Sequence, residues 1–273
     1  MFFMKKLMTR TNVMCKIRRY IDIDTIAVKG FFILFIAFCL TGCSKKAANS
    51  VGNTGYETST LPTEQESGFD SVKRLNEDAF AWLYIPDTEI NYPILQNAEG
   101  DDLFYSDHNE FKEPDANGAI YIEAANLNDM CDFNEVIHGA SPADGTRFAG
   151  LNNFLDKKYF DEHEYAYVYM EDNSLTYYII AAYTRDNTRL LEQYDFSYAS
   201  GCSEFIDEIY NNGDANKIIR EGCETGLSPE HFLITLTTDS AVEPGKQTVV
   251  VGCLVGDAAG NINREIDYGN EEY

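Results

Sequence analysis

The sequence predicts a mostly-β fold, namely a closed barrel of about eight short strands with an N-terminal helix and short inserted helices. Two observations indicate this fold. Short runs rich in β-branched and aromatic residues recur along the chain, separated by turn-forming residues. The chain is also 44% hydrophobic and 13% aromatic, which is enough for a packed core and argues against wholesale disorder.

Each expected element has its own pattern. Apolar residues at 72, 75, 79 and 82 have helical spacing and predict a helix over 72–82. The same kind of spacing predicts a short helix over 203–210, and residues 147–160 have a helical pattern in two pieces. Strands are expected over 82–86, 90–95, 119–122, 133–138, 165–170, 175–184, 232–236 and 248–255. A Pro-Asp turn joins the first two strands, and Glu-Asp-Asn-Ser makes a hairpin of 165–170 and 175–184.

Charge is divided unevenly along the chain. The formal net charge is −24, yet residues 1–42 hold seven bases and only two acids, which leaves −29 on residues 43–273. A basic head on an acidic body is typical of an exported protein. The acidic excess argues against a nucleic-acid partner. Only one apolar run approaches membrane-spanning length, which excludes a multi-pass membrane protein.

The head resembles a bacterial lipoprotein signal peptide. Residues 31–40 form an unbroken apolar run of ten residues, which suits a signal sequence and is short for a spanning helix of about 20. The run ends in Leu40-Thr41-Gly42-Cys43, which resembles a lipobox and implies lipidation of Cys43. An uncleaved anchor with an incidental cysteine is the alternative.

These patterns divide the chain into four segments. We expect a signal peptide over 1–42 and a flexible tether rich in Ser, Thr, Asn, Gly and Glu over 43–68. One folded domain follows over 69–258, and an acidic tail over 259–273. No internal repeat is visible.

Several segments of the folded domain resemble class B sortases. The resemblance covers about residues 72–256. It is carried by Trp82-Leu-Tyr-Ile-Pro86, Ile90-Asn-Tyr-Pro-Ile94, Gly118-Ala-Ile-Tyr-Ile122, Asn134-Glu-Val-Ile-His-Gly139, Asp144-Gly-Thr-Arg-Phe148 and Thr235-Leu-Thr-Thr238. The helix near 203–212 is similar to the class B insertion. The resemblance implies a sortase-like eight-stranded barrel, and a protein lipid-anchored to the outer face of the cell membrane of a Gram-positive bacterium.

The catalytic residues of the family are replaced in this chain. Sortases attach proteins to the cell wall with a Cys nucleophile, a His that protonates the leaving amine and an Arg that stabilises the oxyanion. By resemblance, the His position after His138-Gly139 holds Ala140, the Cys position holds Asp239, and the Arg position holds Gln247.

None of the three replacements can perform the family role. A methyl group moves no proton, a carboxylate is a far weaker acyl-transfer nucleophile than a thiolate, and a neutral amide carries no charge for an oxyanion. The sequence therefore predicts a pseudoenzyme with no catalytic residues. Its expected binding residues are His138, Thr238, Asp239 and Gln247, and its expected partner is a sorting-signal-like peptide, a cell-wall component or an active sortase.

Two other functions stay open. One is an active class B sortase-type transpeptidase with a rewired nucleophile, for which Cys253 and His138 are the candidate pair. The other is a purely structural surface protein whose groove binds nothing.

The cysteines and acidic loops allow further sites. The exported domain has Cys131, Cys202, Cys223 and Cys253, an even set with three possible pairings. Cys202 and Cys223 flank the inserted helix and are the favoured pair, with thiols as the alternative. The acidic loops 101–102 and 126–132 invite a calcium hypothesis, but neither has EF-hand spacing, and no Cys/His cluster has zinc spacing. We expect no metal and no cofactor.

Overall fold

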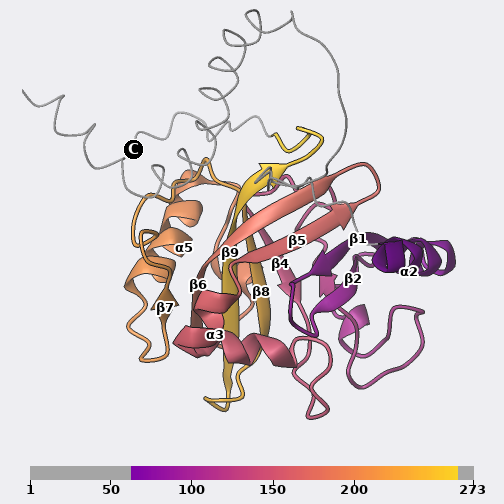
Figure 1. The fold of residues 1–273 in the computed structure, drawn as a ribbon, viewed down its shortest axis with the longest axis horizontal. Helices are drawn as coiled ribbons and strands as arrows, with labels where there is room; N and C mark the ends of the chain where they lie inside the picture. The colour runs from indigo at the N-terminus through magenta and orange to yellow at the C-terminus, as the bar shows by residue number, and fades with distance from the viewer. Residues whose placement is uncertain (1–62, 264–273) are drawn as a thin grey trace, which may run out of the picture. The chain divides into compact units, whose positions relative to one another are not determined.

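Eight strands close into a barrel in the computed structural model, which describes residues 63–263 (Figure 1). The strands of the barrel are β1 (Ala79–Tyr84), β2 (Asn91–Leu95), β3 (Tyr121–Ile122), β4 (Asn134–His138), β5 (Tyr165–Met170), β6 (Ser174–Asp186), β8 (Leu233–Asp239) and β9 (Lys246–Asp257). Their order is β5-β1-β2-β3-β4-β8-β9-β6, and β6 pairs back with β5. The short strand β7 (Ile218–Ile219) adds to β6 outside this ring. The expected mostly-β barrel is confirmed.

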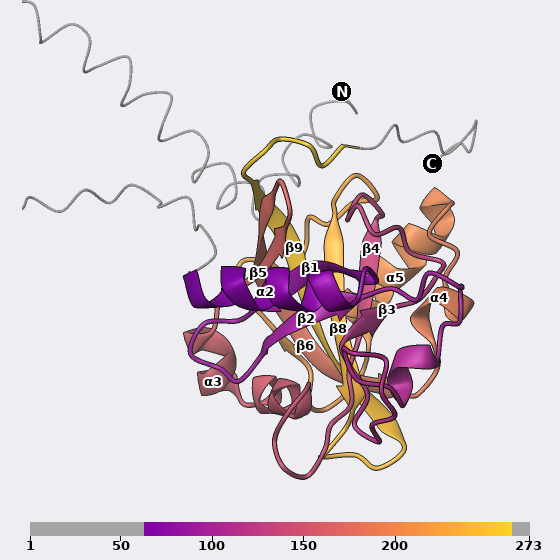
Figure 2. The same cartoon turned by 90° about the vertical axis from the view of Figure 1, so that its right-hand side faces the viewer.

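The helices are short and lie outside the barrel. They are α2 (Thr63–Leu75), the 3-10 helices η1 (Phe104–Ser106) and η2 (Ala149–Leu155), and then α3 (Lys157–Glu162), α4 (Leu190–Gln193) and α5 (Ala199–Asn211). Helix α2 lies across β1 (Figure 2). Phe69 of α2 packs edge-on against Trp82 of β1, with ring centroids 6.4 Å apart. Helix α5 and β7 lie together on another side of the barrel (Figure 1).

Strand side chains alternate between the barrel interior and its outer surface. On β8, Ile234 and Leu236 are buried in the interior cluster with Ile137 of β4 and Val250 of β9. Because strand side chains alternate, Thr235 and Thr237 lie on the outer face. Both are nevertheless buried. The outer face of β8 is therefore covered by other parts of the chain, which matters for the site described below.

The expected helix over 72–82 is wrong in its second half. Helix α2 ends at Leu75, and Trp82 lies in β1. Asn76 stops the helix, because its side-chain oxygen accepts from the backbone N–H of Asp78 at 3.0 Å and forms an Asx turn. The apolar residues at 79 and 82 belong to a strand whose spacing happened to continue the helical pattern. Helix α2 also begins at Thr63, inside the segment expected to be a tether.

Most other element predictions are confirmed. The helical pattern over 147–160 corresponds to η2 and α3, and the pattern over 203–210 to α5. The hairpin of β5 and β6 has the expected turn. Strand β3 is shorter than expected, and η1, α4 and β7 were not predicted. The signal peptide, the lipidation site Cys43 and most of the acidic tail lie outside the described residues.

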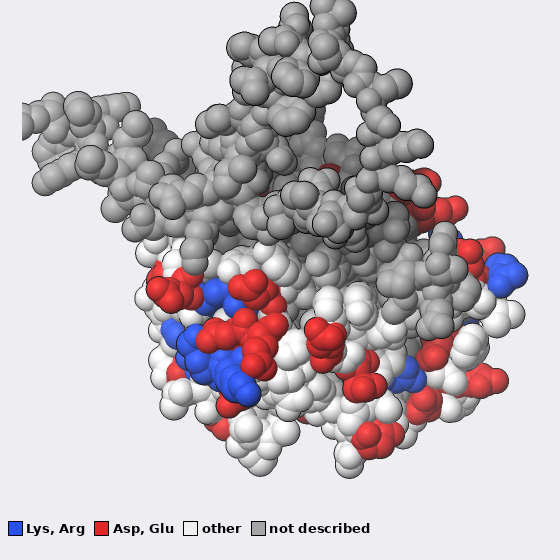
Figure 3. Space-filling view, in the orientation of Figure 1, with Lys and Arg blue, Asp and Glu red and all other residues white. Residues whose placement is uncertain are grey.

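The surface of the described domain is acidic. Figure 3 shows acidic side chains over much of one face, with basic side chains gathered among them. On α3, Lys157 and Lys158 form ion pairs with Asp161 and Glu162, four residues along the helix. Within residues 63–263, no helix has the length and apolar character needed to cross a membrane.

One acidic side chain lies inside the barrel wall. Glu135 is fully buried on β4 and lies on the same strand face as the core residue Ile137, two residues along. Its Oε1 accepts from the backbone N–H of Asp132 at 3.2 Å, and its Oε2 has no hydrogen-bond partner among the described residues. Burial, reinforced by the charge of Asp132, raises the pKa of Glu135 well above its ordinary value. The carboxyl group is therefore held in its protonated form.

This protonation predicts a stability that falls as pH rises. Above the ordinary pKa of 4.5 the unfolded chain loses the Glu135 proton while the folded chain keeps it, so the cost to stability grows with pH. We expect Glu135→Gln to raise the free energy of unfolding at pH 8, because the amide has no proton to lose, by about 1.4 kcal/mol for each pH unit over which only the folded chain keeps the Glu135 proton. The gain should be smaller at pH 5.5. Urea denaturation at both pH values measures it, with exposed Asp172→Asn as control. An equal gain at both pH values would argue against this explanation.

Candidate functional site

The strand register gathers three positions at one edge of the barrel. Strands β4 and β8 are parallel, with His138 opposite Thr237, and the N–H of Gly139 donates to the Thr237 carbonyl at 3.1 Å. Ala140 follows directly, beside the end of β8. Asp239 ends β8 and faces Gln247 across the antiparallel ladder with β9. The register therefore places Ala140, Asp239 and Gln247 near one another at this edge.

The side chain of Gln247 is held on all sides. It is 7% exposed. Its Nε2 donates to the carbonyls of Asp186 and Thr188, at 3.1 and 2.8 Å, and its Oε1 accepts from the Thr237 hydroxyl at 2.5 Å. Every hydrogen-bonding group of this amide is thus used within the protein, and none remains to polarise a substrate carbonyl.

The other two positions also lack acyl-transfer groups. Asp239 is exposed, and Asn152 Nδ2 donates to its backbone oxygen at 3.2 Å. Asn152 further accepts from the Thr248 hydroxyl and the Ala241 N–H, which fixes the start of the β8–β9 loop. Asp239 thus offers a carboxylate, and Ala140 only a methyl group. Thr238 is 4% exposed, and its side chain lies on the opposite face of the sheet from the side chain of Gln247 on β9.

Lys246, the base beside Gln247, is paired with two carboxylates. Its ammonium group lies 2.7 Å from Glu243 and 3.1 Å from Asp214. Hydrogen bonds to these two carboxylates raise the pKa of Lys246. The charge of Lys246 is therefore neutralised by these two carboxylates.

His138 belongs to a charged cluster beside the site. Its Nε2 lies 2.9 Å from Glu123 Oε1, and its ring stacks on Tyr121 with centroids 5.3 Å apart. Glu123 also binds Arg189 Nη2 at 2.8 Å, and Arg189 binds Asp102 at 3.0 Å. Burial alone would raise the pKa of Glu123, but the contacts with His138 and Arg189 outweigh it and lower that pKa. His138 is thus engaged by a buried carboxylate.

Cys253 and His138 do not form a catalytic pair in this structure. Cys253 faces Leu233 on the ladder, four residues along β8 from the partner of His138, which separates the two by about 13 Å along the strands. Cys253 is 1% exposed, and burial raises its pKa to about 12. It is a buried thiol, whereas a nucleophile must be an accessible thiolate.

The remaining cysteines lie away from the site or are buried. Cys131 precedes β4, at the barrel end opposite Ala140, and burial raises its pKa. The expected Cys202–Cys223 disulfide is wrong for this structure, which has thiols at all four cysteines of the described domain. Cys202 Sγ instead donates to the Phe196 carbonyl at 3.5 Å.

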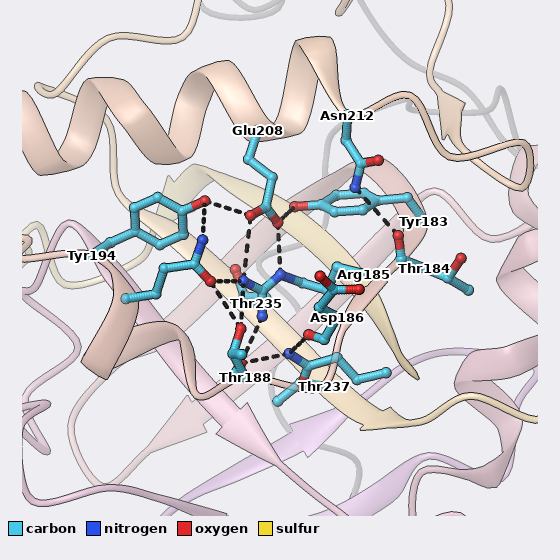
Figure 4. A network of polar contacts seen from close by, with 12 residues as sticks. Tyr183, Thr184, Arg185, Asp186, Thr188, Tyr194, Glu208, Asn212, Thr235 and Thr237 are labelled. Atoms are coloured by element: carbon cyan, nitrogen blue, oxygen red, sulfur yellow. Dashed lines mark hydrogen bonds and ion pairs between the residues drawn. The ribbon is translucent and has the colours of Figure 1, made fainter. Parts of the chain in front are cut away.

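A buried polar network connects Gln247 to the inserted helix α5 (Figure 4). Glu208 of α5 binds Arg185 Nε at 2.7 Å and accepts from the hydroxyls of Tyr183 and Tyr194. Burial and Glu208 raise the pKa of both tyrosines, so both remain donors. Arg185 also donates to the Thr188 carbonyl at 2.8 Å, which is the same carbonyl that Gln247 binds.

The sequence did not indicate the residues of these networks. Glu123 and Glu208 lie far in the chain from their partners Arg189 and Arg185 or belong to another element, and none of the four residues belongs to a motif. The one hint in the sequence is its composition. The chain has few bases and many acids, so a buried arginine is expected to lie against a carboxylate. No group of three or more His, Cys, Asp or Glu side chains within residues 63–263 is arranged to hold a metal ion.

The chain is similar to known sortases in sequence and in structure. Sortase B of Listeria monocytogenes is 29% identical over 214 residues, which cover 76% of this chain and 82% of that protein. A mutant form of Clostridium perfringens sortase B has a TM-score of 0.60 at 25% identity and covers 71% of this chain and 88% of its own. A Staphylococcus aureus sortase B–substrate complex has a TM-score of 0.58 at 21% identity and covers 69% and 84%.

The chain is class B sortase-like. The sequence similarity to sortase B spans most of both proteins, and the eight-stranded barrel matches the sortase B structures. No family model matches the chain. The sortase-like barrel supplies the scaffold, and the side chains at the Ala140, Asp239 and Gln247 edge decide what the scaffold can do.

Proposed function

We propose that this chain is a catalytically inactive class B sortase-like protein that binds a peptide, a cell-wall component or a partner sortase. The observation that carries the proposal is the edge where Ala140, Asp239 and Gln247 meet. By resemblance these are the positions of the family His, Cys and Arg. The scaffold around them is regular, while the proton donor, thiolate and cation are absent from them.

Loss of all three groups removes the reaction rather than slowing it. A sortase reaction needs a thiolate to attack the peptide carbonyl, an acid for the leaving amine and a cation for the oxyanion. Such residues act as a unit, so the remaining scaffold contributes mainly binding. The buried, protonated Cys253 and the Glu123-bound His138 offer no substitute. The rewired transpeptidase is therefore the weaker candidate.

Binding remains available to such a scaffold. The similar Staphylococcus aureus structure is described as a substrate complex. In this chain the edge keeps an exposed carboxylate at Asp239 and the half-buried His138 beside it. We propose that these two residues, with Gln247, border the binding surface.

Peptide binding and peptide turnover by the purified wild-type chain test this function. Saturable binding of labelled sorting-signal peptides, wall fragments or an active sortase, with no peptide cleaved, is the expected result. Absence of binding to all three would favour a purely structural role. Peptide cleavage that Asp239→Ala abolishes would contradict the proposed inactivity.

We further propose that a lipid on Cys43 anchors the chain to the outer face of the cell membrane. The support is the apolar run that ends in Leu40-Thr41-Gly42-Cys43. Metabolic labelling with a fatty acid should place label on the wild-type chain and none on Cys43→Ala. Equal labelling of the two chains would exclude Cys43 as the lipidation site. Cys131→Ala, which keeps Cys43, is the matched control.

A further inference from the structure

Two short segments cover the barrel end that lies opposite the candidate site. Strand β9 finishes at this end, beside the turn between β5 and β6 (Figure 1). The first segment, residues 126–133, is here named the loop cover, and the second, residues 257–263, the C-terminal cover. Met130 of the loop cover is fully buried in the interior cluster, and Ile262 of the C-terminal cover packs against the same cluster. Both covers therefore close over the interior of the barrel.

Acidic side chains hold the two covers in place. Asp132 Oδ2 accepts two hydrogen bonds from within the loop cover, at 3.0 and 2.8 Å. The Asp132 backbone N–H donates to Glu135 Oε1 at 3.2 Å, which ties the loop cover to β4. The Asp257 carboxylate accepts from two backbone N–H groups of the C-terminal cover, at 2.9 and 2.7 Å. The covers meet where the backbone of Asn263 hydrogen-bonds to the Cys131 thiol.

Two polar groups in the interior beneath the covers have no hydrogen-bond partner among the described residues. They are Glu135 Oε2 and the Tyr177 hydroxyl, and both side chains are fully buried. Across the ladder, Ile234 of β8 pairs with Glu135 on one side and with Gly252 of β9 on the other. A Cβ at Gly252 would lie 3.1 Å from the Tyr177 Cβ, so the glycine leaves room for the tyrosine beside this row. An ionised carboxylate is far more costly to bury in such surroundings than a neutral carboxyl group.

The titratable groups that act on this buried pair are acids. They are Asp129, Asp132 and Cys131 of the loop cover, Asp257 of the C-terminal cover, and Cys253 of β9. A negative charge on Glu135 would therefore be repelled by the neighbouring carboxylates as well as excluded by the apolar interior. Ionisation favours an arrangement in which the Glu135 carboxylate reaches water, and the route to water passes between the covers.

We propose that this barrel end is a proton-linked closure, shut while Glu135 carries its proton and opened at the two covers when Glu135 loses it. The ionised carboxylate displaces the loop cover, to which it is bonded through Asp132, and separates Cys131 from Asn263. Opening admits water to this end of the barrel and exposes the Cys131 thiol. The opposite end, with the candidate site, stays in place, so the closure does not depend on the proposed function.

Linkage gives the direction of the pH dependence. Burial raises the pKa of Glu135 well above 4.5 in the closed form, and the pKa returns toward 4.5 once the carboxyl group reaches water. The closed form is therefore most favoured at low pH. Above pH 4.5 the open fraction grows by up to about tenfold for each pH unit, until the pH passes the raised pKa. Glu135→Gln has no proton to lose, so its open fraction should not change with pH.

Labelling of Cys131 with N-ethylmaleimide in the full chain, followed by peptide mass mapping, measures the opening. The wild-type rate is divided by the Glu135→Gln rate at the same pH, so the pH dependence of the thiol itself cancels. We expect this ratio to rise at least about tenfold between pH 5.5 and pH 8.5. A charge on Glu135 in a barrel that stayed closed would instead raise the pKa of Cys131 and lower the ratio. The exposed Asp172→Asn is the matched control and should keep the wild-type rise.

Two results would overturn the closure. A ratio that stays level or falls as the pH rises would show that the covers remain shut over an ionised Glu135. A parallel rise in the labelling of the buried Cys253 would show that the whole barrel unfolds. Hydrogen exchange of residues 126–133 and 257–263 at pH 8.5 gives the same decision if Cys131 reacts too fast in the closed form. Faster exchange in the wild-type chain than in Glu135→Gln, confined to the covers, is expected, and equal exchange in the two chains would contradict the closure.

Discussion

Glu208→Ala is expected to lower the free energy of unfolding by about 3–5 kcal/mol, the usual cost of breaking a buried ion pair. Glu208 accepts from Arg185, Tyr183 and Tyr194, and the Arg185 side chain is 4% exposed. Without Glu208 the guanidinium remains buried with only neutral partners. Urea denaturation measures this loss of stability, and an unchanged m-value shows that the unfolding transition itself is the same in both chains.

Two comparison variants make this result specific. Glu204→Ala lies on the same helix and is exposed, so it should change the free energy of unfolding by less than about 0.5 kcal/mol. Arg185→Met combined with Glu208→Leu removes both charges and should cost less than Glu208→Ala alone. Equal losses for Glu208→Ala and Glu204→Ala would show that the network in Figure 4 does not stabilise the fold.

Local patterns predicted the barrel because its strands have a clear chemical signature. The runs around β5, β6, β8 and β9 are rich in β-branched and aromatic residues and end at turn residues. The helix over 72–82 failed where two elements met, since the apolar residues of α2 and β1 happened to continue one spacing. Asn76, whose side chain ends the helix, was the signal that could have separated them.

The edge of the site was predictable, whereas its surroundings were not. Ala140, Asp239 and Gln247 each follow a recognisable segment, so the resemblance alone assigned all three to one site. The strand register brings the same three positions to one edge of the barrel. The contacts around the edge join residues far apart in the chain: Gln247 and Thr188 are 59 positions apart, and Arg189 and Glu123 are 66 positions apart. Such pairings depend on how the chain closes the barrel, and no local pattern records them.

The amide of Gln247, which by resemblance stands at the family arginine position, makes three hydrogen bonds that are all internal. This geometry supports the proposed inactivity, because no amide N–H remains for a substrate oxygen.

Transpeptidation by the wild-type chain beside the Ala140→His, Asp239→Cys, Gln247→Arg variant tests the loss of catalysis most directly. A sorting-signal peptide and an amine acceptor are supplied, and the transfer product is quantified by mass spectrometry. We expect no product from the wild-type chain above the protein-free control. The triple variant should form product at least about 100-fold faster, because it regains the acid, the nucleophile and the cation together. Product formed by the wild-type chain and lost in Asp239→Ala would contradict an inactive sortase-like protein.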